Sequence, residues 1–269
     1  MSPLAVPLDP SLAESSTRVV PVFQMNGISY NDNEPSAMAL DTQQPQLSQP
    51  VHEAVKSGHH STVQLLLRLQ PSTLDIKDSR GRTPLSFAAS NGYVDIAKTL
   101  LMAGADYAIC DNHGDYPMHR AAENGNTDML QLLMDHLADI QVVNNSGFTG
   151  LFIASQHGHS AAVALLLSRG ADPNVVSVKW RRCALHQAAQ NGHVEIVQLL
   201  ISHGADIHAL EARDATPLWL ASQGGHTDIV RMLLEKGAAV DSRLAGTYHT
   251  PLHMSCQNGH LQTSQLLVA

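Results

Sequence analysis

Apolar and polar positions repeat along most of this chain with a period of 33 or 34 residues. Each period opens with a capping residue and a short apolar stretch, passes through a glycine, and carries a second stretch rich in Leu, Ile and Val. The opening residues are Thr83, Tyr116, Thr149, Cys183, Thr216 and Thr250. A fixed period of this length predicts a stack of similar units and not one thick globular core.

Each period predicts two helices and a turn. A threonine such as Thr83 caps the first helix, and a following proline tolerates that position because its missing N–H is not needed there. Apolar residues and paired alanines at helical spacing predict a face that packs on neighbouring helices. Glycines predict the ends of both helices. The polar residues that follow, such as 111–115, predict a turn that projects as a finger.

The period divides the chain into a leading segment and seven units. We expect a disordered tail at 1–48, because six prolines stand before position 46 and no sustained apolar period is present. A repeat domain is expected at 49–269. Its units are a worn copy at 49–77, then 78–110, 111–143, 144–176, 177–210, 211–243 and an incomplete copy at 244–269. Because the last copy has no closing glycine or polar cap, we expect a fragment or short isoform of a longer protein.

The recurring phrase Thr-Pro-Leu-His-x-Ala-Ala, followed by Asn-Gly-His, identifies the family that these units resemble. The copy at Thr250-Pro251-Leu252-His253 is the most nearly intact opening. Residues 49–269 resemble the ankyrin repeat family. That resemblance implies an all-α solenoid of stacked helix-turn-helix repeats with β-hairpin fingers. It also implies a concave face, lined by the fingers and first helices, where partners of such proteins bind.

Charge and cysteine content narrow the classes of function. The formal net charge is −8, of which residues 1–48 contribute −4, from five acids and one base. Neither part is a polycation, so general nucleic-acid binding is disfavoured. Cys110, Cys183 and Cys256 are too sparse for a disulfide framework. We expect a monomer of the cytoplasm or nucleus, with no secretory signal and no membrane insertion.

The sequence predicts no enzyme active site, metal or cofactor. Eleven of the sixteen histidines stand at recurring repeat positions, and the others are dispersed. No His-Glu-x-x-His motif and no Gly-x-Gly loop occurs, so zinc-protease and nucleotide-binding chemistry have no support.

The unit that departs most from the pattern is the finger at 178–184. It has one extra residue, lacks the Thr-Pro cap, and carries an indole with three cations: Lys179, Trp180, Arg181 and Arg182. Trp and Arg are enriched at interface hot spots. We therefore predict a partner-binding surface here, although Trp180 covering a neighbouring finger, with its bases solvated, is the alternative. The other candidates, on adjoining fingers and at first-helix ends, are Phe148, Arg213, Gln156, His157, Gln190, Asn191 and Gln223.

These patterns favour a protein–protein interaction module or scaffold whose partner lies in the concave groove and on the fingers. The basic finger favours an acidic or phosphorylated segment of that partner. A second hypothesis is a targeting domain of a larger enzyme, such as a kinase or ubiquitin-ligase subunit, with its catalytic part beyond residue 269. A third is a structural spacer, for which changes in the fingers have no effect.

Overall fold

The structure, a computed structural model, describes residues 49–136 and 138–269. These residues form fourteen α-helices and one 3-10 helix (Pro71–Thr73), so the predicted all-α solenoid is confirmed. The helices are α1 (Pro50–Lys56), α2 (His60–Leu69), α3 (Pro84–Asn91), α4 (Val94–Met102), α5 (Pro117–Glu123), α6 (Thr127–Asp135), α7 (Gly150–His157), α8 (Ser160–Ser168), α9 (Ala184–Asn191), α10 (Val194–Ser202), α11 (Pro217–Gly224), α12 (Thr227–Glu235), α13 (Pro251–Gln257) and α14 (Leu261–Val268).

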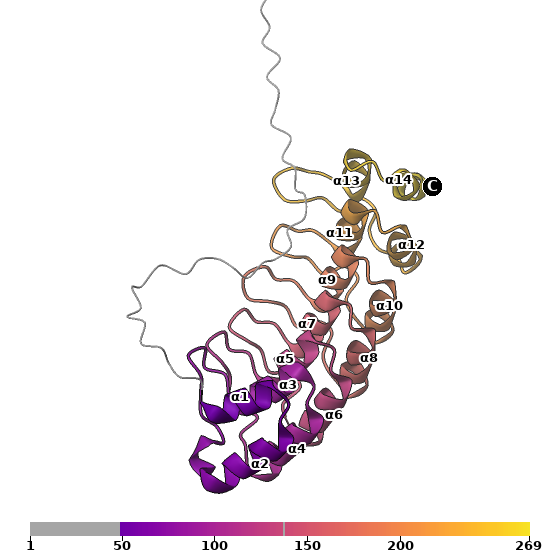
Figure 1. Cartoon of the computed structure of the whole chain (residues 1–269). Helices are drawn as coiled ribbons and strands as arrows, with labels where there is room; N and C mark the ends of the chain where they lie inside the picture. The colour runs from indigo at the N-terminus through magenta and orange to yellow at the C-terminus, as the bar shows by residue number, and fades with distance from the viewer. Residues whose placement is uncertain (1–48, 137) are drawn as a thin grey trace, which may run out of the picture. The chain divides into compact units, whose positions relative to one another are not determined.

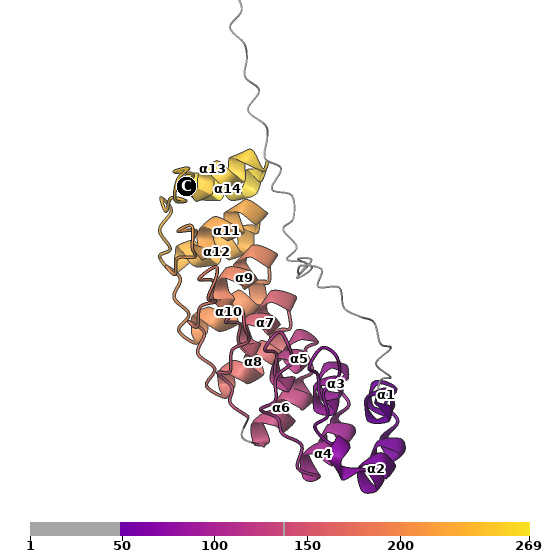
Figure 2. The same ribbon diagram turned by 90° about the vertical axis from the view of Figure 1, so that its left-hand side faces the viewer.

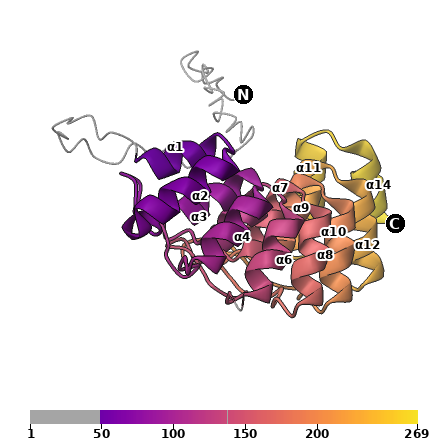
Figure 3. The same ribbon diagram turned by 60° about the horizontal axis from the view of Figure 1, so that its bottom comes forward.

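The helices of the repeat domain form two rows. Odd-numbered helices make one row and even-numbered helices the other, and the loops project beside the odd-numbered row on the inner side of the curve (Figure 1). The pairs keep the same order in two further views, from α1 and α2 to α13 and α14 (Figures 2 and 3). The predicted 1–48 tail lies outside the described residues, and the repeat boundaries stay a prediction.

Local chemistry explains where the first helices begin and end. The side chains of Thr83, Thr149 and Thr216 each accept a hydrogen bond from a backbone N–H at 3.2 Å, as N-caps do. The unit at 183 has no threonine hydroxyl, but it keeps the other bond of the capping box, in which the Cys183 N–H donates to Nδ1 of His186 at 3.2 Å, as the Thr250 N–H does to His253. The first helices at α3, α7, α9 and α11 end on a left-handed glycine.

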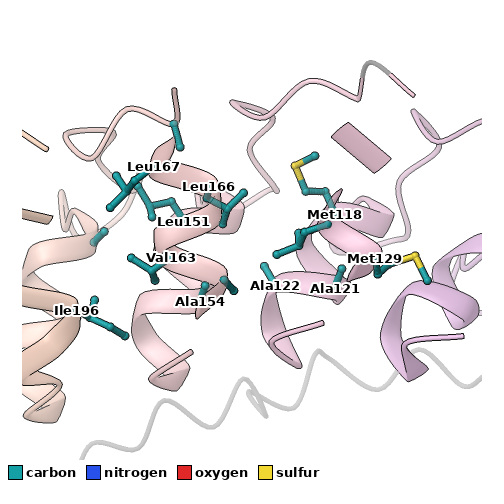
Figure 4. Packing of buried hydrophobic residues seen from close by; sticks show 14 of the residues in the cluster. Met118, Ala121, Ala122, Met129, Leu151, Ala154, Val163, Leu166, Leu167 and Ile196 are labelled. Atoms are coloured by element: carbon teal, nitrogen blue, oxygen red, sulfur yellow. The ribbon is translucent and has the colours of Figure 1, made fainter. Parts of the chain in front are cut away.

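One continuous core runs between the two rows. Figure 4 shows Met118 and Ala122 of α5 on one side and Leu151 of α7 on the other, with Leu166 of α8 between them. Alanines permit close approach of successive odd-numbered helices, while leucines fill the space toward the even-numbered row. The leucine of the Pro-Leu position is at most 2% exposed in Leu85, Leu151, Leu185 and Leu218. Repetition of one packing solution therefore builds the whole domain.

Histidines join each repeat to the one before it. The Nε2 atoms of His159, His193, His226 and His260 lie 2.9–3.3 Å from backbone carbonyl oxygens of the preceding first helix. Each ring also lies against the glycine that ends that helix, where a Cβ would meet it at 2.4–2.7 Å. The histidine and the glycine thus form one recurring joint, which accounts for the Gly-His repetition in the sequence.

Candidate partner-binding surface

Within the described residues, six fingers line one side of the domain, and one backbone hydrogen bond closes each of them. The N–H of the first finger residue donates to the carbonyl of the last at 2.9–3.1 Å in fingers 78–82, 111–115, 144–148, 177–182, 211–215 and 244–249. The predicted extra residue in 177–182 is accommodated inside this closure. The finger at 244–249 has one as well, which the sequence reasoning missed although the 34-residue step before Thr250 signals it.

Neighbouring fingers are joined at their tips by a second backbone bond. The Val178 N–H donates to Ser146 at 3.1 Å, Ala212 to Trp180 at 2.9 Å, and Ala245 to Arg213 at 2.9 Å. Fingers 78–82, 111–115 and 144–148 are joined in the same way. Residues 49–136 and 138–269 contain no regular β-strand, yet this ladder of single bonds holds the finger tips in register.

The Arg182 side chain is largely buried and bonded within the domain, so its positive charge is not available to a partner. Its Nε donates to Glu211 Oε2 at 3.1 Å and its Nη1 to Gln190 Oε1 at 2.7 Å. The side chains of Arg182 and Glu211 are 11% and 4% exposed. Two predicted binding residues therefore have structural roles: Arg182 connects finger 177–182 to Gln190 of α9 and to Glu211 of the next finger.

The remaining residues of the basic finger lie at the surface. Lys179 and Arg181 are exposed and Trp180 is partly buried. The Lys179 ammonium lies 5.2 Å from the centre of the Trp180 ring, within the range of a cation–π contact. Because the Trp180 carbonyl accepts the Ala212 N–H, the exposed Arg213 of the next finger stands close to this group. The structure thus brings Lys179, Trp180, Arg181 and Arg213 together on adjoining fingers; we call these four residues the basic edge.

Phe148 has a different role from the basic edge. Its ring stacks on Phe152 with 4.3 Å between centroids and a 5° angle between planes. Phe152 is 2% exposed, so the stack fixes the base of finger 144–148 against α7. Phe148 is half-buried and offers one ring face at most to a partner.

The ends of the first helices mix framework and surface groups. The Asn191 amide donates to the Gln156 carbonyl at 2.8 Å and so ties α9 to α7. His157 is exposed, and the side chains of Gln156 and Gln223 are partly exposed. Gln156, His157 and Gln223 of this predicted set lie at the surface, and so does Asn191, although its amide is engaged in the bond to α7.

An acidic cluster lies on the same side, two repeats before the basic edge. Arg120 is within 2.7–2.9 Å of carboxylate oxygens of Asp111, Asp115 and Glu123. Burial alone raises the pKa of Asp111, but hydrogen bonds from Arg120 and from two backbone N–H groups outweigh it and lower that pKa. One cation faces three carboxylates, so this part of the surface carries negative charge. The sequence reasoning did not anticipate this cluster, because Arg120 lies nine residues after Asp111, its partner on the finger.

Buried histidines at the Pro-Leu-His position are held as neutral acceptors or donors. Burial, with a further effect of Arg182, lowers the pKa of His186 to about 4. Its Nε2 lies 3.1 Å from the Ala209 carbonyl. Trp219 occupies the same position in the next unit, and its Nε1 donates to the His249 carbonyl at 3.0 Å. The indole therefore replaces the imidazole as a tie to the following loop.

The part of the chain that the structure describes offers neither a metal cluster nor a membrane span. Across those residues, no group of three or more His, Cys, Asp or Glu side chains is arranged to hold a metal ion. None of the helices described above is long and apolar enough to cross a membrane.

Comparison with known proteins identifies the repeat. A family model described as ankyrin repeats in three copies matches residues 29–111, 104–177 and 185–269, and a model of many copies matches 161–201. The crystal structure of the ankyrin repeat domain of Bcl-3, titled a unique member of the IkappaB protein family, has a TM-score of 0.71 and 30% identity. The match covers 82% of this chain and 99% of that one.

Shorter matches link the chain to named regulators. Protein phosphatase 1 regulatory subunit 27 of Mus musculus is 42% identical over 69 residues, which are 26% of this chain and 44% of that protein. Cyclin-dependent kinase 4 inhibitor B of Homo sapiens is 31% identical over 91 residues, 34% of this chain and 59% of the relative. The chain thus spans about half the length of these relatives. With family models matching most of its length, the chain belongs to the ankyrin repeat family and is a protein–protein interaction module.

Proposed function

We propose that this domain acts without catalysis of its own, as a monomer in the cytoplasm or nucleus, and recruits a partner protein to the concave side of its fingers and first helices. The basic edge is the principal contact, and Gln156, His157 and Gln223 extend it. The partner presents an acidic or phosphorylated segment.

One observation carries this proposal. Lys179, Arg181 and Arg213 are exposed, and no described acidic side chain lies within salt-bridge distance of any of them. Arg182 and Arg120, by contrast, are engaged by carboxylates of the domain itself. Exposed cations beside a partly buried indole suit charge-assisted hydrogen bonds to carboxylate or phosphate, with the ring as an apolar anchor.

A second candidate is favoured by the named relatives. A phosphatase regulatory subunit and a kinase inhibitor match parts of the chain, so a signalling enzyme is the partner class that they suggest. On this reading the domain recruits an enzyme, carried on another chain or on the same one. Both candidates use the same surface and differ in what the partner does.

The test measures binding of the full chain to fluorescent 12-residue peptides of four kinds: Glu-rich, phosphoserine-containing, Lys-rich and neutral. We expect the first two to bind and the triple variant Lys179→Ala/Arg213→Ala/Arg181→Ala to lose about tenfold in affinity, since each exposed ion pair contributes roughly 0.2–1 kcal/mol. Binding should also weaken with added salt.

The control removes three cations from the opposite row of helices. Lys98, Arg231 and Lys236 are exposed on α4, on α12 and just after it. Their triple alanine variant changes net charge equally and should keep wild-type affinity within about twofold. Equal losses in both triple variants would refute the basic edge as the site, because net charge alone would then explain binding.

A further inference from the structure

Three successive fingers hold a side chain in a conformation that favours glycine. Arg181, Asp214 and Tyr248 have φ angles of 51°, 63° and 57°, and they are the sole non-glycine residues with positive φ among those described. Each stands directly before the last residue of its finger. The equivalent residues of the three earlier fingers are Gly81, Gly114 and Gly147, with φ of 77–78°.

Glycine is the residue that this backbone favours, so its replacement needs an explanation. A Cβ strains a left-handed residue, least of all in Asp, and such strain persists only where the surrounding structure enforces it, which happens most often at functional sites. In the earlier fingers glycine is required twice over, since a Cβ on Gly81 would lie 2.5 Å from Asn112 Oδ1 and 2.9 Å from its backbone N.

The three side chains gain no stability from burial. Arg181 and Asp214 are exposed, and Tyr248 is 72% exposed. Lys179 and Arg213 are their exposed neighbours, so an anion is favoured near Arg181. Strain at one position in three consecutive fingers, without compensating burial, favours a role for these side chains in contacts with a partner over a role in packing.

The finger ladder sets the spacing of the row. Backbone bonds from Ala212 to Trp180 and from Ala245 to Arg213, both 2.9 Å, keep the three fingers in register. Successive repeats stack at the spacing of packed helices, roughly 10 Å. An extended segment in the polyproline II conformation advances about 3.1 Å per residue with three residues per turn, so every third side chain of a partner points the same way and meets the next finger.

We propose that Arg181, Asp214 and Tyr248 form a recognition row that binds an extended, acidic segment of a partner protein with a basic residue three positions from an acid. The acid faces Arg181, the base faces Asp214, and an apolar or aromatic residue three positions further faces the ring of Tyr248. This inference rests on the proposed function and adds the order of charges that the surface selects.

The test is an interaction cycle between the full chain and three 12-residue peptides of equal length. One has the sequence pattern acid-x-x-Lys-x-x-Phe in a Glu-containing background. The second carries Gln in place of that Lys, and the third moves the Lys by one residue. For the wild-type chain we expect the first peptide to bind about fivefold more tightly than either of the others. For Asp214→Asn this preference should vanish.

The stability of glycine variants is a second measurement that distinguishes recognition from a structural role, because loss of a structural contact would lower stability. Replacing Arg181, Asp214 or Tyr248 singly by Gly should raise the urea midpoint of unfolding and lower affinity for the first peptide. The control Ala212→Gly, on an exposed finger residue outside the row, should leave affinity unchanged.

The outcomes separate the two proposals. If affinity follows net negative charge alone, with no effect of Lys position and no effect of Asp214→Asn, the recognition row is refuted while the basic edge stands. If the glycine variants lower the urea midpoint, the strain argument fails. If none of the three peptides binds, the row is refuted as well, and the Glu-rich and phosphoserine peptides decide the proposed function independently.

Discussion

We predict that replacing two left-handed glycines by alanine destabilises the domain by different amounts, because a histidine ring packs against one of them and not against the other. Gly192 has φ 79°, and a Cβ there would lie 2.6 Å from Cε1 of His226, whose Nε2 lies 3.0 Å from the Gln190 carbonyl. Gly204, in the same repeat, has φ 85°, and a Cβ there would meet nothing within 4 Å. Gly192→Ala and Gly204→Ala therefore share the backbone cost and differ in the collision.

The two costs can be separated in magnitude. A left-handed alanine costs about 1–2 kcal/mol, of which roughly 0.4–1 is offset because alanine restricts the unfolded chain. We expect Gly204→Ala to lower the free energy of unfolding by about 1 kcal/mol. Gly192→Ala should cost about 2 kcal/mol more, because the imidazole is displaced, its hydrogen bond is lost and packing is strained.

A double-mutant cycle with His226→Ala isolates the joint. Urea unfolding followed by helical circular dichroism gives the four stabilities, which are compared only where the denaturant slopes agree. In the His226→Ala background, Gly192→Ala should cost no more than Gly204→Ala costs in the wild-type chain. Equal costs of the two glycine variants in the wild-type chain would refute the joint, since the collision would then have no energetic consequence.

Three further predictions follow from the side-chain contacts. The pKa of His186, about 4, lies below its ordinary 6.5, so its stability contribution is present above pH 6.5 and is lost as pH falls toward 4. We expect a loss of about 3 kcal/mol at pH 4 by urea unfolding, and a flatter profile in His186→Asn would support the assignment. Glu211→Gln should destabilise the domain by about 2 kcal/mol, because it removes the buried negative charge that pairs with the Arg182 guanidinium at 3.1 Å; a change below about 0.5 kcal/mol by the same assay would contradict this. Trp219→Phe should cost about 0.5–1.5 kcal/mol by removing the indole N–H that donates to the His249 carbonyl at 3.0 Å, a carbonyl that keeps the Leu244 N–H as a second donor; an unchanged melting midpoint would contradict that.

The sequence was sufficient for the fold because the information is repeated and local. Threonine caps, glycine ends and alanine pairs act within a few residues, so they predict helices without knowledge of distant contacts. The exclusion of Arg182 from the binding surface was not predictable in the same way. It depends on Glu211, 29 residues away, and on a side-chain conformation that only the packed neighbours determine.

The recognition row could also have been found in the sequence, because side chains replace glycine at one finger position. Aligning the fingers on their closing positions places Arg181, Asp214 and Tyr248 opposite Gly81, Gly114 and Gly147. The sequence shows that these positions carry side chains, but only the structure shows that their φ angles are positive and the backbone therefore strained. The available charge of Lys179 and Arg213 likewise depends on which nearby acids are already engaged.

The backbone ladder between finger tips and the histidine joints affect which residues of this domain can be substituted during evolution. Both use main-chain carbonyls as acceptors, and the ladder uses main-chain donors too. A main-chain partner is the same whatever residue carries it, so the exposed side chains of a finger can be exchanged without loosening its neighbours. Exposed finger residues such as Lys179 and Arg213 are therefore positions where related chains can acquire new specificities through single substitutions, while largely buried finger residues such as Arg182 and the joints beneath them constrain the rest of the repeat.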